Sequence, residues 1–337
     1  MKYSVKKISE LTGFSPATVS NALNNKKGVN KDTAEQILRV AKEVGYVSGA
    51  KVSSIKFVIY KRDGLVVSDT PFFAALMEGV ERACREAGYD TVIYTINQGE
   101  DGFEARLKEI INDSSSGVLL LATELTKEDM SIFKHTYCPL VVLDAWFENM
   151  AFDTVLANNE DSAKDAVLFL VDKGHREIGY LSGTVRTRNF IDRGTGYRRA
   201  LAERKIPLNG DYRVRLTPTM DGAYKDMCRY LGTGPKLPTA FFADNDIVAL
   251  GAMKALKQFG YKVPQDISII GFDDLPFSEI SSPALTTIRF FQQEMGRVAV
   301  QHLVEKIKTR DTINSKVQIS TEFIERESVR DLNKYEI

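Results

Sequence analysis

Short hydroxyl and amide side chains gather between residues 15 and 21, and lysines follow them closely. An asparagine can bond the edge of an adenine through both amide atoms, and an alanine can contact a thymine methyl group. Hydroxyl groups suit phosphate oxygens, whereas lysines add an attraction that does not depend on base sequence. These residue types predict contact with double-stranded DNA, and the candidates are Ser15, Pro16, Ala17, Thr18, Ser20, Asn21, Asn25, Lys26 and Lys27.

A second group of polar and aromatic side chains follows apolar runs later in the chain. A carboxylate such as Asp273 can accept hydrogen bonds from two hydroxyl groups of a polyol, and Arg193 offers five donors in a rigid fork. Flat aromatic rings can stack on sugar faces or nucleobases. The sequence therefore predicts a site for a small polar ligand, and its candidate residues are Phe72, Phe73, Asp144, Trp146, Asn189, Arg193, Asn245 and Asp273.

These ligand candidates also have structural interpretations, which the sequence leaves open. One of the two phenylalanines fits the core, and Trp146 fits equally well between two units of the body. Asn245 is also suited to capping a helix, and Asp273 to capping a turn.

Composition and motifs narrow the class of protein. No cluster of His, Cys and carboxylates has metal-ligand spacing, and neither a G-x-S-x-G motif nor a phosphate-binding loop is present, so we expect no enzyme, metal or cofactor. A glycoside hydrolase would need a second carboxylate at catalytic distance from Asp273 and Asp274. Three scattered cysteines and the lack of a signal peptide or a long apolar run favour a cytoplasmic protein over an exported solute-binding protein or a membrane protein.

The residues that must position the DNA candidates form three short amphipathic segments. Val5, Ile8 and Leu11 share one helical face, and the next helix begins at Pro16 after a turn with Ser15 as its N-cap. A third helix is predicted from about residue 31 to 44, with Asn30 as its cap. Residues 1–54 hold nine Lys and Arg against four Asp and Glu, so a basic helix-turn-helix head precedes an acidic body.

After residue 55 the pattern changes to short apolar runs that alternate with amphipathic segments. This alternation predicts parallel sheets with helices on both faces, and the number of runs favours two similar α/β halves. Ligands bind such sheets at the carboxyl ends of their strands, where the second group of residues lies. The predicted strands are 55–60, 90–96, 117–122, 139–144, 176–183, 212–217, 239–244 and 266–274.

The head resembles the DNA-binding domain of the lactose-repressor (LacI/GalR) family. The family pattern V-S-x-x-T-V-S-x-x-L-N is similar to the segment from Phe14 to Asn24. Further blocks that resemble the family are 69–89, 158–183, 193–201, 243–256, 263–276 and 283–289. The resemblance implies a periplasmic-binding-protein-like body of two doubly wound parallel-sheet subdomains, with chain crossings near 156–160, 285–290 and 314–318.

The implied organisation is a head, a hinge, two interleaved subdomains and a tail. The residue ranges are 1–46 for the helix-turn-helix head, 47–54 for the hinge, 55–157 with 287–316 for the N-terminal subdomain, 158–286 with 317–330 for the C-terminal subdomain, and 331–337 for the tail. Family hinges are longer and carry a leucine that wedges into the minor groove. Val52 is the sizeable apolar candidate for such a DNA contact after Val47, so the hinge departs from the family.

The resemblance implies a homodimeric transcriptional regulator, and we expect a repressor of operator DNA controlled by a sugar or sugar phosphate. Dimer contacts are expected from helices near 71–88 and 245–260. The alternative is a co-repressed or global regulator whose DNA binding is strengthened by a ligand or by a partner phosphoprotein.

Overall fold

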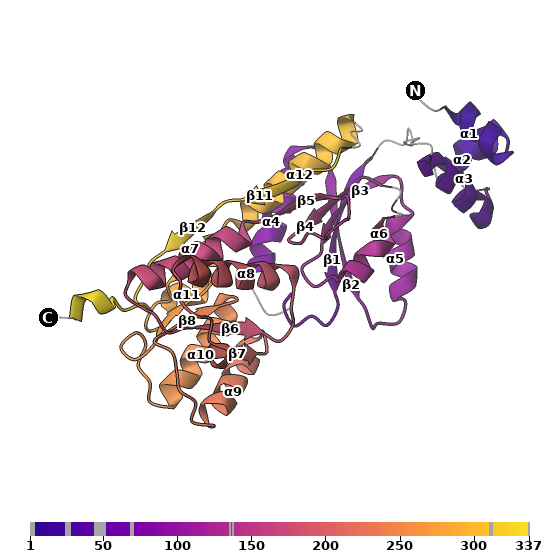
Figure 1. The fold of residues 1–337 in the computed structure, drawn as a ribbon. Helices are drawn as coiled ribbons and strands as arrows, with labels where there is room; N and C mark the ends of the chain where they lie inside the picture. Colours follow the sequence, from indigo (N-terminus) through magenta and orange to yellow (C-terminus); the bar gives the residue numbers. More distant parts are fainter. Residues whose placement is uncertain are drawn as a thin grey trace.

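A three-helix head and an α/β body make up the computed structural model (Figure 1), which describes residues 4–23, 28–43, 52–67, 71–134, 136, 138–309 and 313–335. The head helices are α1 (Val5–Thr12), α2 (Pro16–Leu23) and α3 (Lys31–Glu43). Gly13 ends α1 with a φ of 75°, a conformation that glycine adopts without steric cost. The Ser15 hydroxyl accepts the backbone N–H of Thr18 at 3.1 Å, so the predicted cap of α2 is present.

The head core is small and forms where the three helices meet. Its buried side chains are Ile8, Val19, Ala22, Leu23, Ile37 and Ala41. Leu11 was expected on the same helical face as Ile8, but half of its surface is exposed, so it does not belong to the core. In a helix of eight residues the packing of α2 and α3 centres on Ile8, and Leu11 lies beyond it.

The first subdomain is built on a six-stranded parallel sheet with the order β11-β5-β4-β3-β1-β2. One face carries α4 (Phe72–Glu86) and α12 (Gln292–Thr309), and the other carries α5 (Phe103–Ile111) and α6 (Lys127–Phe133) (Figure 1). Alternate residues of each strand enter the two cores, as a sheet covered on both faces requires. The strands are β1 (Ser54–Lys61), β2 (Asp90–Asn97), β3 (Ser116–Leu121), β4 (Leu140–Leu143), β5 (Asp153–Ala157) and β11 (Lys316–Ile319).

The second subdomain repeats the plan with a four-stranded parallel sheet in the order β7-β6-β8-β9. Helices α7 (Asn159–Asp172) and α8 (Arg188–Glu203) cover one face, and α9 (Met220–Leu231) and α10 (Asp246–Gln258) cover the other. A short helix, α11 (Pro276–Ile280), follows the last strand. The strands are β6 (Ile178–Gly183), β7 (Arg213–Leu216), β8 (Ala240–Ala243) and β9 (Ser268–Ile270).

Three chain segments join the subdomains. The first is the step from β5 to α7, and the other two involve the antiparallel pair β10 (Thr287–Phe290) and β12 (Thr321–Ile324). Strand β11 pairs with β5 in the first sheet, so the third crossing follows Ile319 rather than falling near 314–318. The register explains the difference, because the ladder with β5 continues as far as the pair Ile319–Ala157.

The described residues after β12 pack against the second subdomain. Residues Leu332–Tyr335 form a 3₁₀ turn, η2, and a second such turn, η1, spans Gly210–Tyr212. The Asn333 side chain donates to the carbonyl of Asp172 at 2.9 Å, so η2 is held against the end of α7. None of the helices in the described part of the chain is long and apolar enough to cross a membrane.

Candidate DNA interface and inter-subdomain site

Helix α2 presents the predicted DNA contacts on the side opposite its buried face. Ser15, Pro16 and Ala17 are exposed, while Val19 is fully buried between the helices. Thr18, Ser20 and Asn21 are partly exposed. The exposed and partly exposed residues of α2 and its cap therefore carry hydroxyl, methyl and amide groups, which are the types of group that can contact base edges and phosphates.

The remaining DNA candidates lie at the edges of the described residues. Asn25, Lys26 and Lys27 fall outside them, as does most of the predicted hinge. Val52 is described, is partly buried and stands outside any helix, two residues before β1 begins.

Arg193 is the centre of the polar site between the subdomains. Its guanidinium group is buried and donates to Asn159 Oδ1 at 2.8 Å, to the Asp244 carbonyl at 2.6 Å and to Asp273 Oδ1 at 3.2 Å. It also lies 3.6 Å over the ring of Phe272. Each of the three guanidinium nitrogens thus donates to a group of the second subdomain.

Two asparagines extend this cluster to the first subdomain. Asn159 Nδ2 donates to Asn189 Oδ1 at 3.0 Å, and Asn189 Nδ2 donates to the Asp144 carbonyl at 2.9 Å. The Asp144 carboxylate in turn accepts the Thr123 hydroxyl at 2.7 Å. We call Asp144, Asn159, Asn189, Arg193 and Asp273 the bridging cluster, because a continuous chain of hydrogen bonds joins the two subdomains through them.

The two carboxylates of the bridging cluster are unusual in backbone and in protonation. Asp144 and Asp273 have φ angles of 62° and 116°, conformations that cost energy for a residue with a side chain. Burial raises the pKa of Asp144 to about 6. Burial also raises the pKa of Asp273 to about 7, against the opposing charge of Arg193. Such features gather at functional sites because binding groups are held in place at the expense of local stability.

The aromatic candidates and Asn245 occupy structural positions in this conformation. Phe72 and Phe73 are both buried in the first core, and Phe72 stacks on Phe290 with 5.6 Å between ring centroids. Asn245 Oδ1 accepts the backbone N–H of Val248 at 3.0 Å and caps α10. The structural interpretation that the sequence left open therefore describes these three residues here.

Trp146 packs between the subdomains. Its indole N–H donates to Asp192 at 2.9 Å, while the guanidinium of Arg188 lies 3.7 Å and the ammonium of Lys316 4.1 Å from the ring centroid. Cations over an indole ring are attracted by its negative face. The ring is thus occupied by protein groups rather than open for stacking on a ligand.

A cavity of about 500 Å³ opens beside Trp146, between the two subdomains. This volume suits a small ligand. Its walls are residues 62–63, 124–127, 146–148, 185–188 and 191. Trp146 is the sequence-predicted ligand residue among them. Asn159 and the basic residues of the cavity were missed, although Asn159 lies two residues after β5 and Arg62 directly follows β1, positions where parallel sheets bind ligands.

One wall of this cavity is held by a buried glutamate. The Glu124 carboxylate accepts the backbone N–H groups of Arg62, Gly64, Val66 and Val67, each at 2.9 Å. Four charge-assisted bonds from one segment hold the loop after β1 in a single shape. Glu124 is therefore a positioning residue for this wall.

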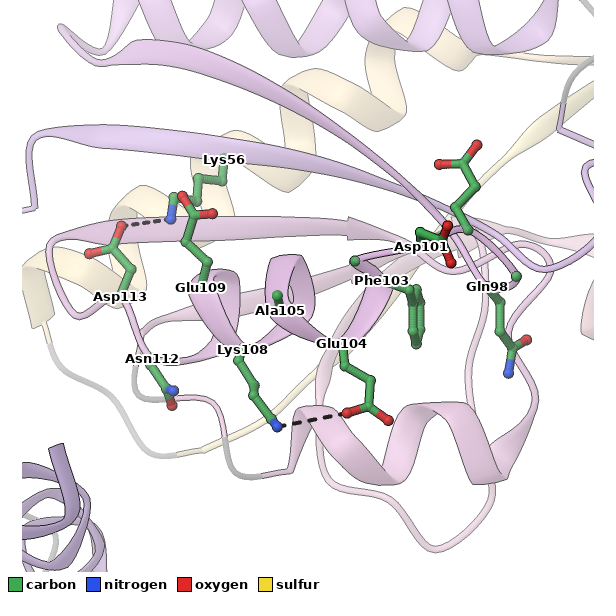
Figure 2. A pocket seen from close by; sticks show the side chains of 13 residues that line it. Lys56, Gln98, Asp101, Phe103, Glu104, Ala105, Lys108, Glu109, Asn112 and Asp113 are labelled. Atoms are coloured by element: carbon green, nitrogen blue, oxygen red, sulfur yellow. Dashed lines mark ion pairs between the residues drawn. The ribbon is translucent and has the colours of Figure 1, made fainter.

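A larger hollow of about 1180 Å³ lies on the flank of the first subdomain, along α5 (Figure 2). Figure 2 shows the ion pairs Lys56–Asp113 and Lys108–Glu104 at its border, at 2.7 and 3.8 Å. None of the residues of the bridging cluster lines it. All of its lining residues belong to the first subdomain, whereas the cavity beside Trp146 has walls from both subdomains.

Two family models match the chain. One, described as bacterial regulatory proteins of the lacI family, matches residues 4–48, and one described as a periplasmic binding protein-like domain matches residues 167–329. The HTH-type transcriptional repressor PurR of Haemophilus influenzae (strain ATCC 51907 / DSM 11121 / KW20 / Rd) is 32% identical over 334 residues, covering 97% of this chain and 99% of the relative. The ribose operon repressor of the same strain is 32% identical over 330 residues, with coverage of 97% and 99%.

Solved structures give the same fold. A complex of the transcriptional regulator CelR with cellobiose has a TM-score of 0.75 and 25% identity, covering 97% of this chain and all of that chain. The lac repressor dimer bound to operator and the anti-inducer ONPF has a TM-score of 0.72 and 20% identity, covering 98% of this chain and all of that chain.

A helix-turn-helix head joined to a periplasmic-binding-protein-like body defines a ligand-responsive regulator of DNA. The chain belongs to the lacI family of bacterial regulatory proteins. The family resemblance and the fold predicted from the sequence are thereby confirmed.

Proposed function

We propose that this protein is a transcriptional repressor that binds a near-palindromic operator as a homodimer and responds to a small polar effector, a sugar or sugar phosphate, between its subdomains. The bridging cluster is the observation that carries the proposal. It joins the subdomains through groups that bond hydroxyls well, so an effector that competes for them changes how the subdomains are held together.

The relatives support the same assignment. Those named above are repressors, and the structural relative of 25% identity is described as a complex with cellobiose, a sugar. We therefore place the response to a small ligand at the cluster of Asp144, Asn189, Arg193 and Asp273, and place this protein in the cytoplasm with its DNA.

Exposed apolar side chains support the pairing of two copies. Phe259 and Tyr261 follow α10, and Phe277 and Ile280 lie on α11, with 42%, 37%, 44% and 79% of their surfaces exposed. Exposed apolar side chains of this kind favour a protein interface in the second subdomain. A homodimer brings two heads to the two half-sites of an operator.

Selection of DNA from a random pool by the intact protein tests the DNA-binding part of the proposal. The expected product is a sequence with two related half-sites in inverted orientation. Enrichment of no sequence would contradict it.

Thermal unfolding against a panel of sugars and sugar phosphates tests the effector part. A ligand at 100 times its dissociation constant adds about 2.7 kcal/mol to the free energy of unfolding. The binding ligand should then change the affinity for the selected DNA in the wild type and not in Asp273→Asn. The direction of the change distinguishes an induced repressor from the co-repressed alternative. An unchanged response in Asp273→Asn would place the ligand elsewhere.

A further inference from the structure

We propose that the cavity beside Trp146 binds the anionic group, a phosphate or a carboxylate, of a charged effector. The inference rests on the proposed function and narrows its ligand class from polar molecules to anionic ones. Both subdomains supply positive charge to this cavity. Arg62 lies in the loop after β1 and Lys127 begins α6, both in the first subdomain, and Arg186 and Arg188 precede or begin α8 in the second.

The acidic side chains at the cavity are already engaged by other groups. Glu124 accepts four backbone N–H groups, and Asp63 Oδ1 accepts the backbone N–H of Leu65 at 2.9 Å. Glu148 lies 3.3 Å from the guanidinium of Arg188. These carboxylates are therefore held by the protein itself and not directed at a cationic ligand.

The basic side chains divide into two pairs according to whether a carboxylate already contacts them. Arg186 is bound to the buried Asp244 at 2.5 Å, and Arg188 contacts Asp192 at 3.0 Å. Within the part of the chain that the structure describes, neither Arg62 nor Lys127 has a carboxylate partner, and both are exposed at the rim. Arg62 and Lys127 are thus the two cations of the cavity wall that are not already paired with a carboxylate among the described residues.

Helix α8 adds donors from the other side of the cavity. It begins at Arg188 after the cap Thr187, so its positive end and its first backbone N–H groups are at the cavity wall. Independently, Arg188 Nε is buried with no hydrogen-bond partner among the described residues. A buried donor without a partner costs free energy, and the other nitrogens of this guanidinium already contact Glu148 and Asp192. We infer that an anion at this wall adds a further acceptor beside Arg188.

The same helix connects this cavity to the bridging cluster. Arg188 lines the cavity, while Asn189 and Arg193, on the same first turns of α8, belong to the cluster. One ligand can therefore place its charged group beside Arg62, Lys127 and Arg188 and its hydroxyl groups toward Asn189 and Asp273. Sugar phosphates and sugar acids have this chemistry, and neutral sugars lack the charged end.

Inorganic phosphate and acetate are the probes for the anion site, because they need no knowledge of the sugar. Trp146 is the single tryptophan of the chain, and it lines the cavity, so its fluorescence reports on occupancy directly. We expect a saturable change in emission with phosphate or acetate that sodium chloride at the same ionic strength does not produce. Saturation with phosphate alone indicates a phosphorylated effector, and saturation with acetate alone a carboxylated one.

The double variant Arg62→Gln/Lys127→Gln should weaken binding of the saturating anion about tenfold, the loss expected for charged hydrogen-bond donors at a partly exposed site. The matched control is Lys225→Gln/Arg229→Gln, which removes the same two charges from exposed positions on α9 and should bind like the wild type. The proposal is overturned if neither anion saturates, or if the double variant and the control bind equally well.

The selection of operator DNA separates this inference from the proposed function. A protein that selects inverted half-sites but binds neither anion is a repressor with a neutral effector. A protein that selects no DNA sequence contradicts the proposed function whether or not it binds anions.

Discussion

Helix α2, the predicted recognition helix, and the bridging cluster differ in whether their polar side chains are already bonded within the protein. Helix α2 carries Ser15, Pro16 and Ala17 exposed on a helix of eight residues, ready to meet DNA. In the bridging cluster, Arg193 and Asp273 are buried and bonded to neighbours within the protein. Helix α2 can therefore contact DNA without breaking hydrogen bonds inside the protein. An effector at the bridging cluster must replace some of the hydrogen bonds there. This difference explains how a small ligand can alter the arrangement of the subdomains.

The largest expected effect comes from breaking the bridging cluster at its centre. Arg193→Met leaves the buried Asp273 without its ionic partner, so the free energy of unfolding should fall by about 3–5 kcal/mol. Urea unfolding followed by circular dichroism measures it. Arg199→Met, which removes an exposed ion pair on the same helix, is the control and should leave the free energy of unfolding close to that of the wild type. Equal losses in the two variants would show that the buried ion pair has no special weight.

The recognition helix should respond in specificity rather than stability. Asn21→Ala is expected to lose about 1–3 kcal/mol of discrimination at one base pair of each half-site, since the amide can no longer bond a base edge. Fluorescence anisotropy on the selected DNA and on single-base variants measures this loss. Lys26→Ala should instead weaken all sequences alike. The same uniform weakening in Asn21→Ala would remove its base-reading role.

The protonation of Asp273 gives the bridging cluster a pH dependence. Its pKa is about 7 in the folded protein against about 3.9 unfolded, so the folded state retains a proton that the unfolded state has lost. Stability from this group is therefore present at low pH and is lost as pH rises through about 7. We expect a loss on the order of 2–3 kcal/mol between pH 5 and pH 8.

Asp273→Asn should flatten this loss in thermal unfolding, and the comparison with the wild type is the readout. Asp144 and Asp246, each with a pKa raised to about 6 by burial, contribute in the same direction. Burial lowers the pKa of His175, which contributes the opposite slope. An identical pH profile in wild type and variant would mean that Asp273 does not titrate in this window.

The smallest effect concerns the start of the recognition helix. Ser15→Ala removes the side-chain cap of α2 and should cost about 1 kcal/mol of local stability. Amide hydrogen exchange in α2 should then be about fivefold faster. Ser15→Asp keeps a capping oxygen and should restore slow exchange. Failure of Ser15→Asp to do so would point to a role of the hydroxyl other than capping.

The sequence predicts the helices and strands of the head and the body better than it predicts which side chains are buried. Caps, turns and periodicity locate α1, α2 and α3, because each signal is local and acts within a few residues. Strand runs also locate the two sheets. The sequence does not predict the exposure of Leu11. Periodicity gives the helical face of a residue, whereas its burial depends on which other helices pack against it.

The ligand site is less predictable because its contacts join distant segments. The structure brings together four of the predicted residues, Asp144, Asn189, Arg193 and Asp273. Their partner Asn159, and Glu124, which holds the loop after β1, belong to no sequence motif that would have predicted them. Trp146 meets Asp192 across 46 positions in the sequence, so its role between the subdomains needs the folded chain. Arg62 and Lys127 could have been predicted from their positions, because each is a basic residue that follows closely after a parallel strand, β1 or β3.

The most direct test of the central claim is the affinity of the intact protein for its selected operator with and without its effector, in the wild type and in Asp273→Asn. We predict that the ligand changes the wild-type dissociation constant by about 5-fold to 150-fold, the usual range of coupling between sites, and leaves that of the variant unchanged. A wild-type affinity that no bound ligand alters would contradict the account.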